Sequence, residues 1–225
     1  MITISKEDYL KAILEAESEG EHVISATLAH WLKVSAPAVT MALRRLRKDG
    51  LVSVRADGRV ELTPEGRQIA RRTVVRHHLI ERMLHEVFGM EWWKVHEEAE
   101  RLEHAVSADF EAKLAAKLGR TADCPHGNPV TPVSPAARRK RGMKPLVEGE
   151  EDRSYEVHSV YERDGKLQEF LDQRGIRPGA RVRVLARSYD QTLTLETEAG
   201  RVTLGAPAAE RIWVSGKGTR ASKNS

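Results

Sequence analysis

The chain has 225 residues, of which 31% are charged and only 5% are aromatic, and its formal net charge is +4. This length allows two or three small domains, and so modest a net charge does not by itself indicate a nucleic-acid partner. The single cysteine, Cys124, excludes an intrachain disulfide framework and is typical of a reducing cytosol. Because no apolar stretch is long enough to cross a bilayer, we expect a cytoplasmic protein with no membrane partner.

The first 63 residues are predicted to form three helices followed by a hairpin. The second helix is expected from about Ser25 to Trp31, and the third carries Pro37 in its first turn and stops at Gly50. Two short alternating segments around the turn "ADG" then indicate the hairpin. This order of elements is typical of a winged helix-turn-helix domain, which binds DNA.

The third helix of such a domain presents its first residues to base edges in the major groove. The residues there are small or apolar, so they can touch thymine methyl groups but make few bidentate base contacts. The basic residues that follow suit phosphates, which position a protein without reading sequence. Basic residues on a helix are more often only a solvated face, and the complete order of elements is what favours nucleic acid. The candidate DNA contacts are Ser35, Ala36, Pro37, Ala38, Thr40, Met41, Arg44, Arg45, Arg47, Lys48, Arg55 and Arg59.

Two long helices are predicted next, one over residues 64–88 and one over about 92–118. The second contains "VHEEAERLEH", in which a series of His and Glu follows the spacing of an apolar stripe. The series is displaced by one residue from the core stripe, so these groups lie beside the buried face and need partners such as a bound cation. The polar series is His96, Glu100, Glu103 and His104, and the core stripe is Val95, Ala99, Leu102, Val106 and Phe110.

The first long helix offers His77, Glu81 and His85 at steps of four, a spacing at which two side chains can hold one ion. Two neighbouring helices that both carry His and Glu at ligand spacing favour a metal site over solvated faces. Asp8 either completes a capping box with Ser5 or acts as a further ligand.

The rest of the chain is predicted to be a linker, a small domain and a tail. Residues 125–149 are rich in Pro and Gly and end in a basic run, which indicates a linker. Cys124 and His126 in "CPHG" could suggest a metal, but without a second cysteine we expect a structural turn. Strand-like segments with one helix among them predict a small β-barrel over 150–214, and the tail 215–225 is predicted to be disordered.

With these residues in view, the chain resembles the diphtheria toxin repressor family of metal-dependent transcriptional repressors, particularly its manganese transport regulator branch. The most specific carriers of the resemblance are "HHLIERML" and "KVHEEAERLEH". The resemblance covers nearly the whole chain and implies an α+β multidomain protein. Its parts would be a winged helix-turn-helix at 1–63, a helical dimerisation and metal-binding domain at 64–124, and an SH3-like domain at 150–214.

The resemblance also implies two metal sites in each subunit. The primary site would consist of Asp8, Glu100, Glu103 and His104. The ancillary site would consist of His77, Glu81, His96 and a ligand from the SH3-like domain, Glu162 or alternatively Asp164; Ser159 stands where some relatives have a ligating Glu.

Three departures from relatives bear on the choice of metal or on the number of ions in a site. Iron-selective members have Met and Cys where this chain has Asp8 and Glu100, and carboxylate oxygen suits the harder Mn²⁺. Lys11 stands where some manganese regulators have a glutamate that helps to build a two-metal cluster, which favours two separate sites.

The function that the resemblance implies is a homodimer that binds a palindromic operator when loaded with Mn²⁺ and represses metal-uptake genes, without enzymatic activity or a small-molecule substrate. An Fe²⁺-dependent repressor of the same family is the alternative. Carboxylate-bridged di-iron enzymes use Glu-x-x-His on two helices, and neither long helix has that motif. A third interpretation keeps the DNA-binding domain and places an organic effector in the barrel.

Overall fold

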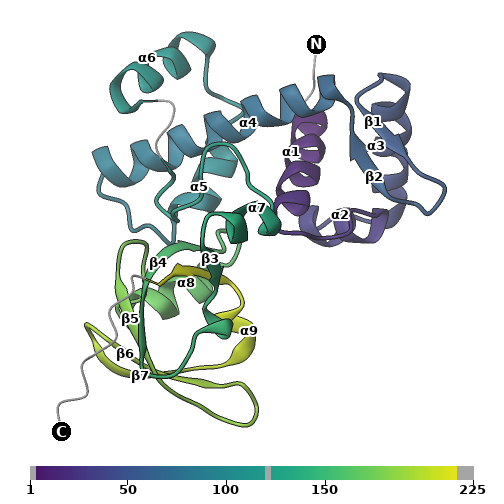
Figure 1. Cartoon of the computed structure of the whole chain (residues 1–225). Coiled ribbons are helices and arrows are strands. Elements are labelled where there is room, and N and C mark those ends of the chain that lie inside the picture. Colours follow the sequence, from purple (N-terminus) through teal and green to yellow (C-terminus); the bar gives the residue numbers. More distant parts are fainter. Residues whose placement is uncertain (1–3, 120–122, 217–225) are drawn as a thin grey trace, which may run out of the picture. The chain divides into compact units, whose positions relative to one another are not determined.

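The computed structural model describes residues 4–119 and 123–216 (Figure 1). The chain divides into two compact units, each with its own hydrophobic core. The first unit is Met1–Ile80, Arg101–Thr121 and Val130–Pro135, and the second is Glu81–Glu100, Ala122–Pro129 and Ala136–Ser225. Among the described residues, no helix combines the length and the apolarity that a membrane crossing requires.

The first unit begins with the predicted winged helix-turn-helix. Its elements are α1 (Ile4–Ser18), α2 (Ser25–Leu32), α3 (Ala36–Lys48), β1 (Val52–Val54) and β2 (Val60–Leu62). Leu10, Ile13 and Leu28 are fully buried between the three helices. Ser35 caps α3 by accepting a hydrogen bond from the Ala38 N–H at 3.4 Å, and β1 and β2 pair antiparallel. The order of elements predicted from the sequence is confirmed.

After the hairpin, the first predicted long helix is present almost in full, whereas the second is divided into two shorter helices. The elements are α4 (Pro64–Arg82), which continues into the π-helical turn η1 (Met83–Val87), α5 (Val95–Leu102) and α6 (Ala108–Leu118). The single helix expected over 92–118 is wrong, because a turn follows α5 and Ser107 starts a new helix by accepting a hydrogen bond from the Phe110 N–H. Phe110 is 42% exposed, so its predicted place in the core is also wrong. Glu103 and His104 therefore lie just beyond the end of α5.

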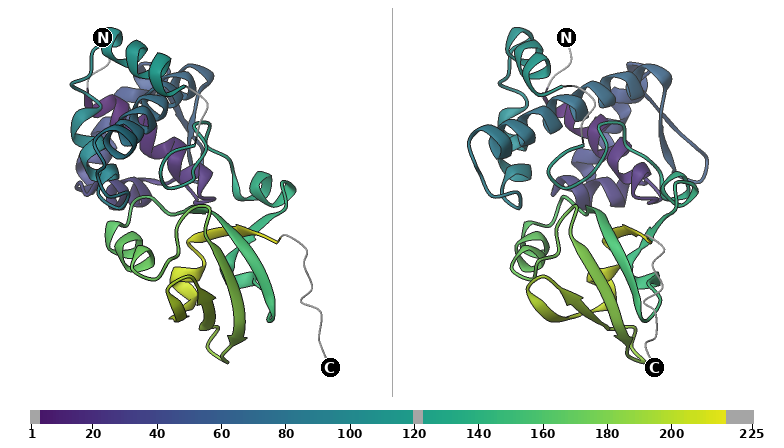
Figure 2. Two further views of the ribbon diagram at one scale, coloured as in Figure 1. Left: turned by 90° about the vertical axis from the view of Figure 1, so that its left-hand side faces the viewer. Right: turned by 60° about the vertical axis from the view of Figure 1, so that its left-hand side comes forward.

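The second unit contains a six-stranded antiparallel sheet with the order β3-β8-β4-β5-β6-β7. Figure 2 shows α8 (Gly165–Asp172) beside this sheet, where its Leu171 joins the core. Among the described strands β3 and β7 do not pair, so the SH3-like sheet is open and not the closed barrel that the sequence predicted. The strands are β3 (Met143–Pro145), β4 (Arg153–Val160), β5 (Arg181–Arg187), β6 (Leu193–Thr197), β7 (Gly200–Leu204) and β8 (Ile212–Ser215).

The predicted linker is partly regular structure. It contains α7 (Pro135–Lys140), β3 and the short 3-10 helix η2 (Leu146–Glu148), and α9 (Ala206–Ala209) precedes the last strand. Strands β3 and β8 are absent from the sequence prediction because each is only three or four residues long and shows no alternating pattern. The predicted disordered tail, apart from Ser215 and Gly216, lies outside the described residues.

Candidate metal centre and nucleic-acid interface

A group of three possible metal ligands lies in the first unit, where α1 faces the turn after α5. Asp8, Glu103 and His104 each offer a ligand atom, and these atoms all lie within 4.8 Å of one another. The Nε2 atom of His104 is 2.7 Å from the Oδ1 atom of Asp8. An ion with bonds of 2.0–2.2 Å holds its ligands at most about 4.4 Å apart. The group therefore fits a divalent ion after small side-chain shifts.

The two carboxylates of this group have different environments. Burial raises the pKa of Asp8, and His104 opposes that rise. Burial also raises the pKa of Glu103, but the charge of Lys11 and the hydrogen bond with His77 outweigh it and lower the pKa to about 2. Glu103 is therefore ionised at neutral pH, even though its side chain is only 2% exposed.

Glu7 and Arg76 contact the group on the side of the His104 Nδ1 atom and the Glu103 carbonyl oxygen. The Nδ1 atom of His104 lies 3.3 Å from Glu7 Oε2 but makes no hydrogen bond within the described part of the chain, so a small side-chain shift would let Glu7 orient the imidazole of a ligating histidine. Arg76 donates to Glu111 at 3.0 Å and to the Glu103 carbonyl oxygen at 3.3 Å, and its Nη1 atom is 3.5 Å from Glu7. The sequence analysis missed both residues, because their contacts join positions far apart in the chain.

Glu100, the fourth predicted primary ligand, is not among the grouped ligand atoms of the described residues. Its Oε1 atom lies 3.3 Å from Arg163 Nη1 and 3.5 Å from His96 Nε2. The side chain is 40% exposed, so it retains room to change rotamer. Its role as a metal ligand stays a prediction.

The second unit holds another set of possible ligands. Glu81, Cys124 and Glu162 offer ligand atoms within 4.8 Å of one another, and His126 Nδ1 lies 3.5 Å from Glu81 and 3.7 Å from the Cys124 sulfur. His96, predicted for the ancillary site, lies 3.1 Å from Glu81. Burial, together with Glu81 and Glu162, raises the pKa of the Cys124 thiol. A bound metal would oppose that rise, since metals bind the thiolate.

Cys124 and His126 do form the expected turn, because the Gly127 N–H donates to the Cys124 carbonyl oxygen at 2.8 Å. Their side chains nevertheless face Glu81, and without a second cysteine nothing in the local sequence indicates this. Of the two alternatives for the last ligand, Asp164 caps α8 by accepting from the Leu167 N–H at 2.9 Å. The geometry therefore favours Glu162 over Asp164.

The role of His77 as an ancillary ligand stays a prediction, and both His77 and His85, the remaining histidines of the ligand pattern, contact further groups. His77 lies one turn before Glu81 on α4, and its Nδ1 atom is 2.6 Å from Glu103 Oε2 and 2.9 Å from Lys11 Nζ. His85 is exposed, and its Nδ1 atom is 2.8 Å from the Met90 carbonyl oxygen.

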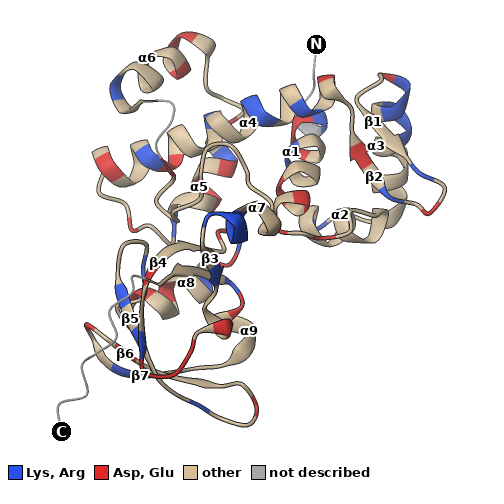
Figure 3. Ribbon diagram, viewed as in Figure 1, with Lys and Arg blue, Asp and Glu red and all other residues tan. Residues whose placement is uncertain are grey.

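The predicted DNA contacts lie on an exposed, basic surface of α3 and the wing (Figure 3). All of them are exposed except Arg59, which is half-buried and contacts His22 Nδ1 at 2.6 Å. Arg55 pairs with Glu61 at 2.7 Å. The four basic residues of α3, by contrast, make no ion pair within the described part of the chain, and this leaves their charges available to phosphates; they are Arg44, Arg45, Arg47 and Lys48.

Replacing Arg44 and Arg47 together with Ala should weaken DNA binding and reduce its dependence on salt. Each phosphate contact that is lost lowers the slope of log affinity against log salt by about 0.9. The slope is measured by fluorescence anisotropy on a labelled duplex. The control is Lys113→Ala with Lys117→Ala, two exposed cations of α6. An unchanged slope in the α3 variant, or an equal change in the control, would contradict contacts between the basic residues of α3 and the DNA phosphates.

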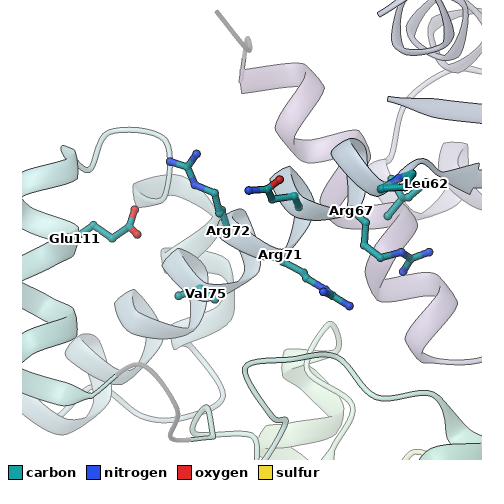
Figure 4. Close-up of a pocket in the computed structure, with 8 residues that line it drawn as sticks. Leu62, Arg67, Arg71, Arg72, Val75 and Glu111 are labelled. Atoms are coloured by element: carbon teal, nitrogen blue, oxygen red, sulfur yellow. The ribbon is translucent and has the colours of Figure 1, made fainter. Parts of the chain in front are cut away.

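A hollow of about 560 Å³ lies along α4 and is separate from both sets of ligands. In Figure 4 the side chains of Arg71 and Arg72 leave α4 in different directions. The hollow is lined by Leu62, Pro64, Arg67, Gln68, Arg71, Arg72, Val75 and Glu111. It contains none of the predicted metal ligands or DNA contacts.

Family models match three segments of the chain. Residues 1–60 match the N-terminal DNA binding domain of iron dependent repressors, residues 63–132 match their metal binding and dimerisation domain, and residues 144–216 match the FeoA domain. These boundaries follow the winged helix, the helices α4–α6 and the open sheet.

Known proteins are similar over most of the chain. The diphtheria toxin repressor of Corynebacterium glutamicum is 32% identical over 188 residues, which are 80% of this chain and 82% of that protein. The iron-dependent repressor IdeR of Mycobacterium bovis is 40% identical over 124 residues, 55% of this chain and 54% of that protein. Among solved structures, a manganese-dependent transcriptional repressor in complex with manganese is 34% identical with a TM-score of 0.82, covering 94% of this chain and 99% of that chain. The manganese regulator SloR is 28% identical with a TM-score of 0.76, covering 96% and 100%.

Proposed function

The chain belongs to the iron-dependent, or diphtheria toxin, repressor family of metal-dependent transcriptional repressors, and from this premise we propose that Mn²⁺ is the ion that controls its binding to DNA. It is a DNA-binding regulator with a dimerisation domain and not an enzyme. The observation that carries the proposal is the composition of the Asp8, Glu103 and His104 group, which offers carboxylate oxygens and an imidazole but no sulfur. Such donors suit a harder ion such as Mn²⁺.

Glu100 is proposed to complete this primary site. When bound, the ion would neutralise carboxylates that otherwise repel one another and would link α1 to the segment after α5. Because α1 packs against α2 and α3 in one core, a restraint on Asp8 is transmitted to the helix that enters the major groove. Glu103 and His104 belong to the segment that matches the dimerisation domain.

We propose that two subunits read a roughly palindromic operator with one winged domain per half-site, since the symmetry of a dimer is mirrored in the DNA that it binds. The ion would then set the spacing of the two copies of α3. Genes for metal uptake are the proposed targets, because repression by the loaded protein would close a feedback loop on metal supply.

The proposal is tested by titrating the protein onto operator DNA in the presence of Mn²⁺, Fe²⁺, Zn²⁺ or a chelator. We expect Mn²⁺ to raise the affinity for DNA, and we expect the operator to raise the affinity for Mn²⁺ by the same factor, because the coupling is reciprocal. DNA binding that is equally tight in chelator and in every metal would overturn the proposed switch.

Fe²⁺ is the second candidate, and two observations favour it. The 40%-identical relatives are iron-dependent repressors, and the second set of ligands includes the sulfur of Cys124, which prefers softer ions. A preference for Fe²⁺ over Mn²⁺ in the anaerobic titration would decide for this alternative. A Glu100→Cys variant should shift the preference towards Fe²⁺.

We propose that Glu81, Cys124, His126 and Glu162, with His96 beside them, hold a second ion. Cys124→Ser should lower the affinity of this second site for Zn²⁺ or Cd²⁺ by about tenfold or more. The effect on Mn²⁺ should be smaller, because oxygen replaces the only sulfur ligand. Competition with a chromophoric chelator measures the metal affinities of both sites in one experiment, so the primary site is the internal control. Equal losses of affinity for soft and hard ions would contradict a role for the thiolate.

A further inference from the structure

Arg163, in the SH3-like domain, contacts the carboxylate that is proposed to complete the primary site. It lies in the turn between β4 and α8, and its Nη1 atom is 3.3 Å from Glu100 Oε1. The side chain of Arg163 is 16% exposed and that of Glu100 is 40% exposed. Both residues belong to the second unit, and they are too far apart in the sequence for a local pattern to indicate the contact.

A histidine contacts the same oxygen of Glu100. His96 Nε2 lies 3.5 Å from Glu100 Oε1, and His96 Nδ1 lies 3.1 Å from Glu81 in the second set of ligands. Glu100 is the last residue of the second unit before the chain passes into the first unit at Arg101. Its carboxylate is therefore held by residues of the second unit.

This rotamer of Glu100 does not serve the primary site. Within the described chain, Glu100 does not join the ligand atoms of Asp8, Glu103 and His104, although it precedes Glu103 by only three residues. A guanidinium stays charged at physiological pH, and it repels a divalent cation that approaches the same carboxylate. Arg163 and a metal ion therefore compete for Glu100.

We propose that Arg163 is a positioning residue of the primary site, which holds the Glu100 carboxylate away from the three grouped ligands and lowers the affinity of that site for its ion. The inference rests on the proposed function, since it concerns the same site. Its consequence is that the SH3-like domain tunes the primary site without supplying a ligand to it. Glu162, the residue before Arg163, belongs to the second set of ligands, so one turn of this domain contacts both Glu100 and the second set.

The experiment measures the Mn²⁺ affinity of the full-length protein by competition with a chromophoric chelator, and the primary site is the one whose binding Asp8→Asn removes. Arg163→Met, which keeps an apolar stem without the charge, should raise the affinity of this site about two- to fivefold, the range expected from a partly exposed ion pair. Arg163→Lys keeps the cation and should stay close to wild type. The matched control is Lys166→Met, which removes an exposed cation from the first turn of α8 and should leave the affinity unchanged.

Glu100→Gln shows whether the effect of Arg163 passes through this ion pair. Alone, the substitution should lower the Mn²⁺ affinity of the primary site, because it removes a charged ligand. Adding Arg163→Met should then cause no further change, because the carboxylate that Arg163 withholds is gone. A gain in affinity that persists in this background would reflect only the repulsion between the ion and a nearby charge, and it would overturn the inference.

Unchanged or weaker binding in Arg163→Met would also overturn the inference, as would an equal gain in Lys166→Met. If Arg163→Met folds poorly, Arg163→Gln serves instead, with the same expected direction. If Glu100→Gln alone binds Mn²⁺ as tightly as wild type, Glu100 is not a ligand, and the proposed primary site loses it together with the role of Arg163. If Glu100→Gln weakens binding while Arg163→Met and Arg163→Gln change nothing, only the role of Arg163 fails.

Discussion

Asp8→Asn is expected to abolish the effect of Mn²⁺ on operator affinity while leaving the affinity of the metal-free protein unchanged. The amide can still contact His104 Nε2, which lies 2.7 Å from Asp8 Oδ1, but it carries no charge and is a poor ligand for a divalent ion. Coupling free energies between a ligand and an effector commonly correspond to affinity changes of about 5- to 150-fold. Nearly all of that change should disappear, as measured by anisotropy with and without Mn²⁺.

Asp109→Asn provides the matched control for this experiment. Asp109 is an exposed carboxylate in the first turn of α6, so the substitution removes the same charge from the same unit without touching the site. It should retain the full response to Mn²⁺. A normal response in Asp8→Asn would show that α1 contributes nothing to the metal centre.

The largest effect on stability is expected for Glu103→Ala in the metal-free protein. The substitution leaves the Lys11 ammonium, which is 4% exposed, as a buried charge without its carboxylate. Breaking a buried ion pair in this way costs about 3–5 kcal/mol of unfolding free energy. Urea denaturation in the presence of a chelator measures this loss. A double-mutant cycle with Lys11→Met should show that the two losses are far from additive, and additive losses would contradict the pair.

The same pair predicts how stability depends on pH. The pKa of Glu103 is about 2 in the folded chain and 4.5 as the ordinary value, so the unfolded chain binds the proton more tightly. The stabilisation is therefore complete above about pH 5 and is lost as the pH falls towards 2. This part of the acid sensitivity should be missing in Glu103→Ala, and an identical pH profile in both proteins would contradict the assignment.

The winged helix could be predicted because its signals are local. Ser35 and Pro37 mark the start of α3, Gly50 adopts a positive φ of 71° just after its end, and the residues around the wing turn alternate in polarity. The break after α5 could not be predicted in the same way. The His and Glu spacing continues through it without interruption, and only the side chain of Ser107 competes with the helix there.

The candidate metal site was only partly accessible from the sequence. Spacing alone groups His96, Glu100, Glu103 and His104, yet in the structure Glu103 and His104 face Asp8, which is about 95 residues away in the sequence. The resemblance to the repressor family supplied Asp8, and nothing in the sequence indicated the contacts of Arg76 or the burial of Lys11. Such long-range pairings depend on tertiary packing, which local patterns do not record.

The most direct test of the account is a crystal of the Mn²⁺-loaded protein measured at the manganese absorption edge. We predict an anomalous peak within bonding distance, about 2.0–2.3 Å, of the Asp8 and Glu103 carboxylates and of His104 Nε2. A fully loaded protein in which no peak touches Asp8, with α1 bound to no ion, would contradict the claim that the metal links this helix to the segment after α5.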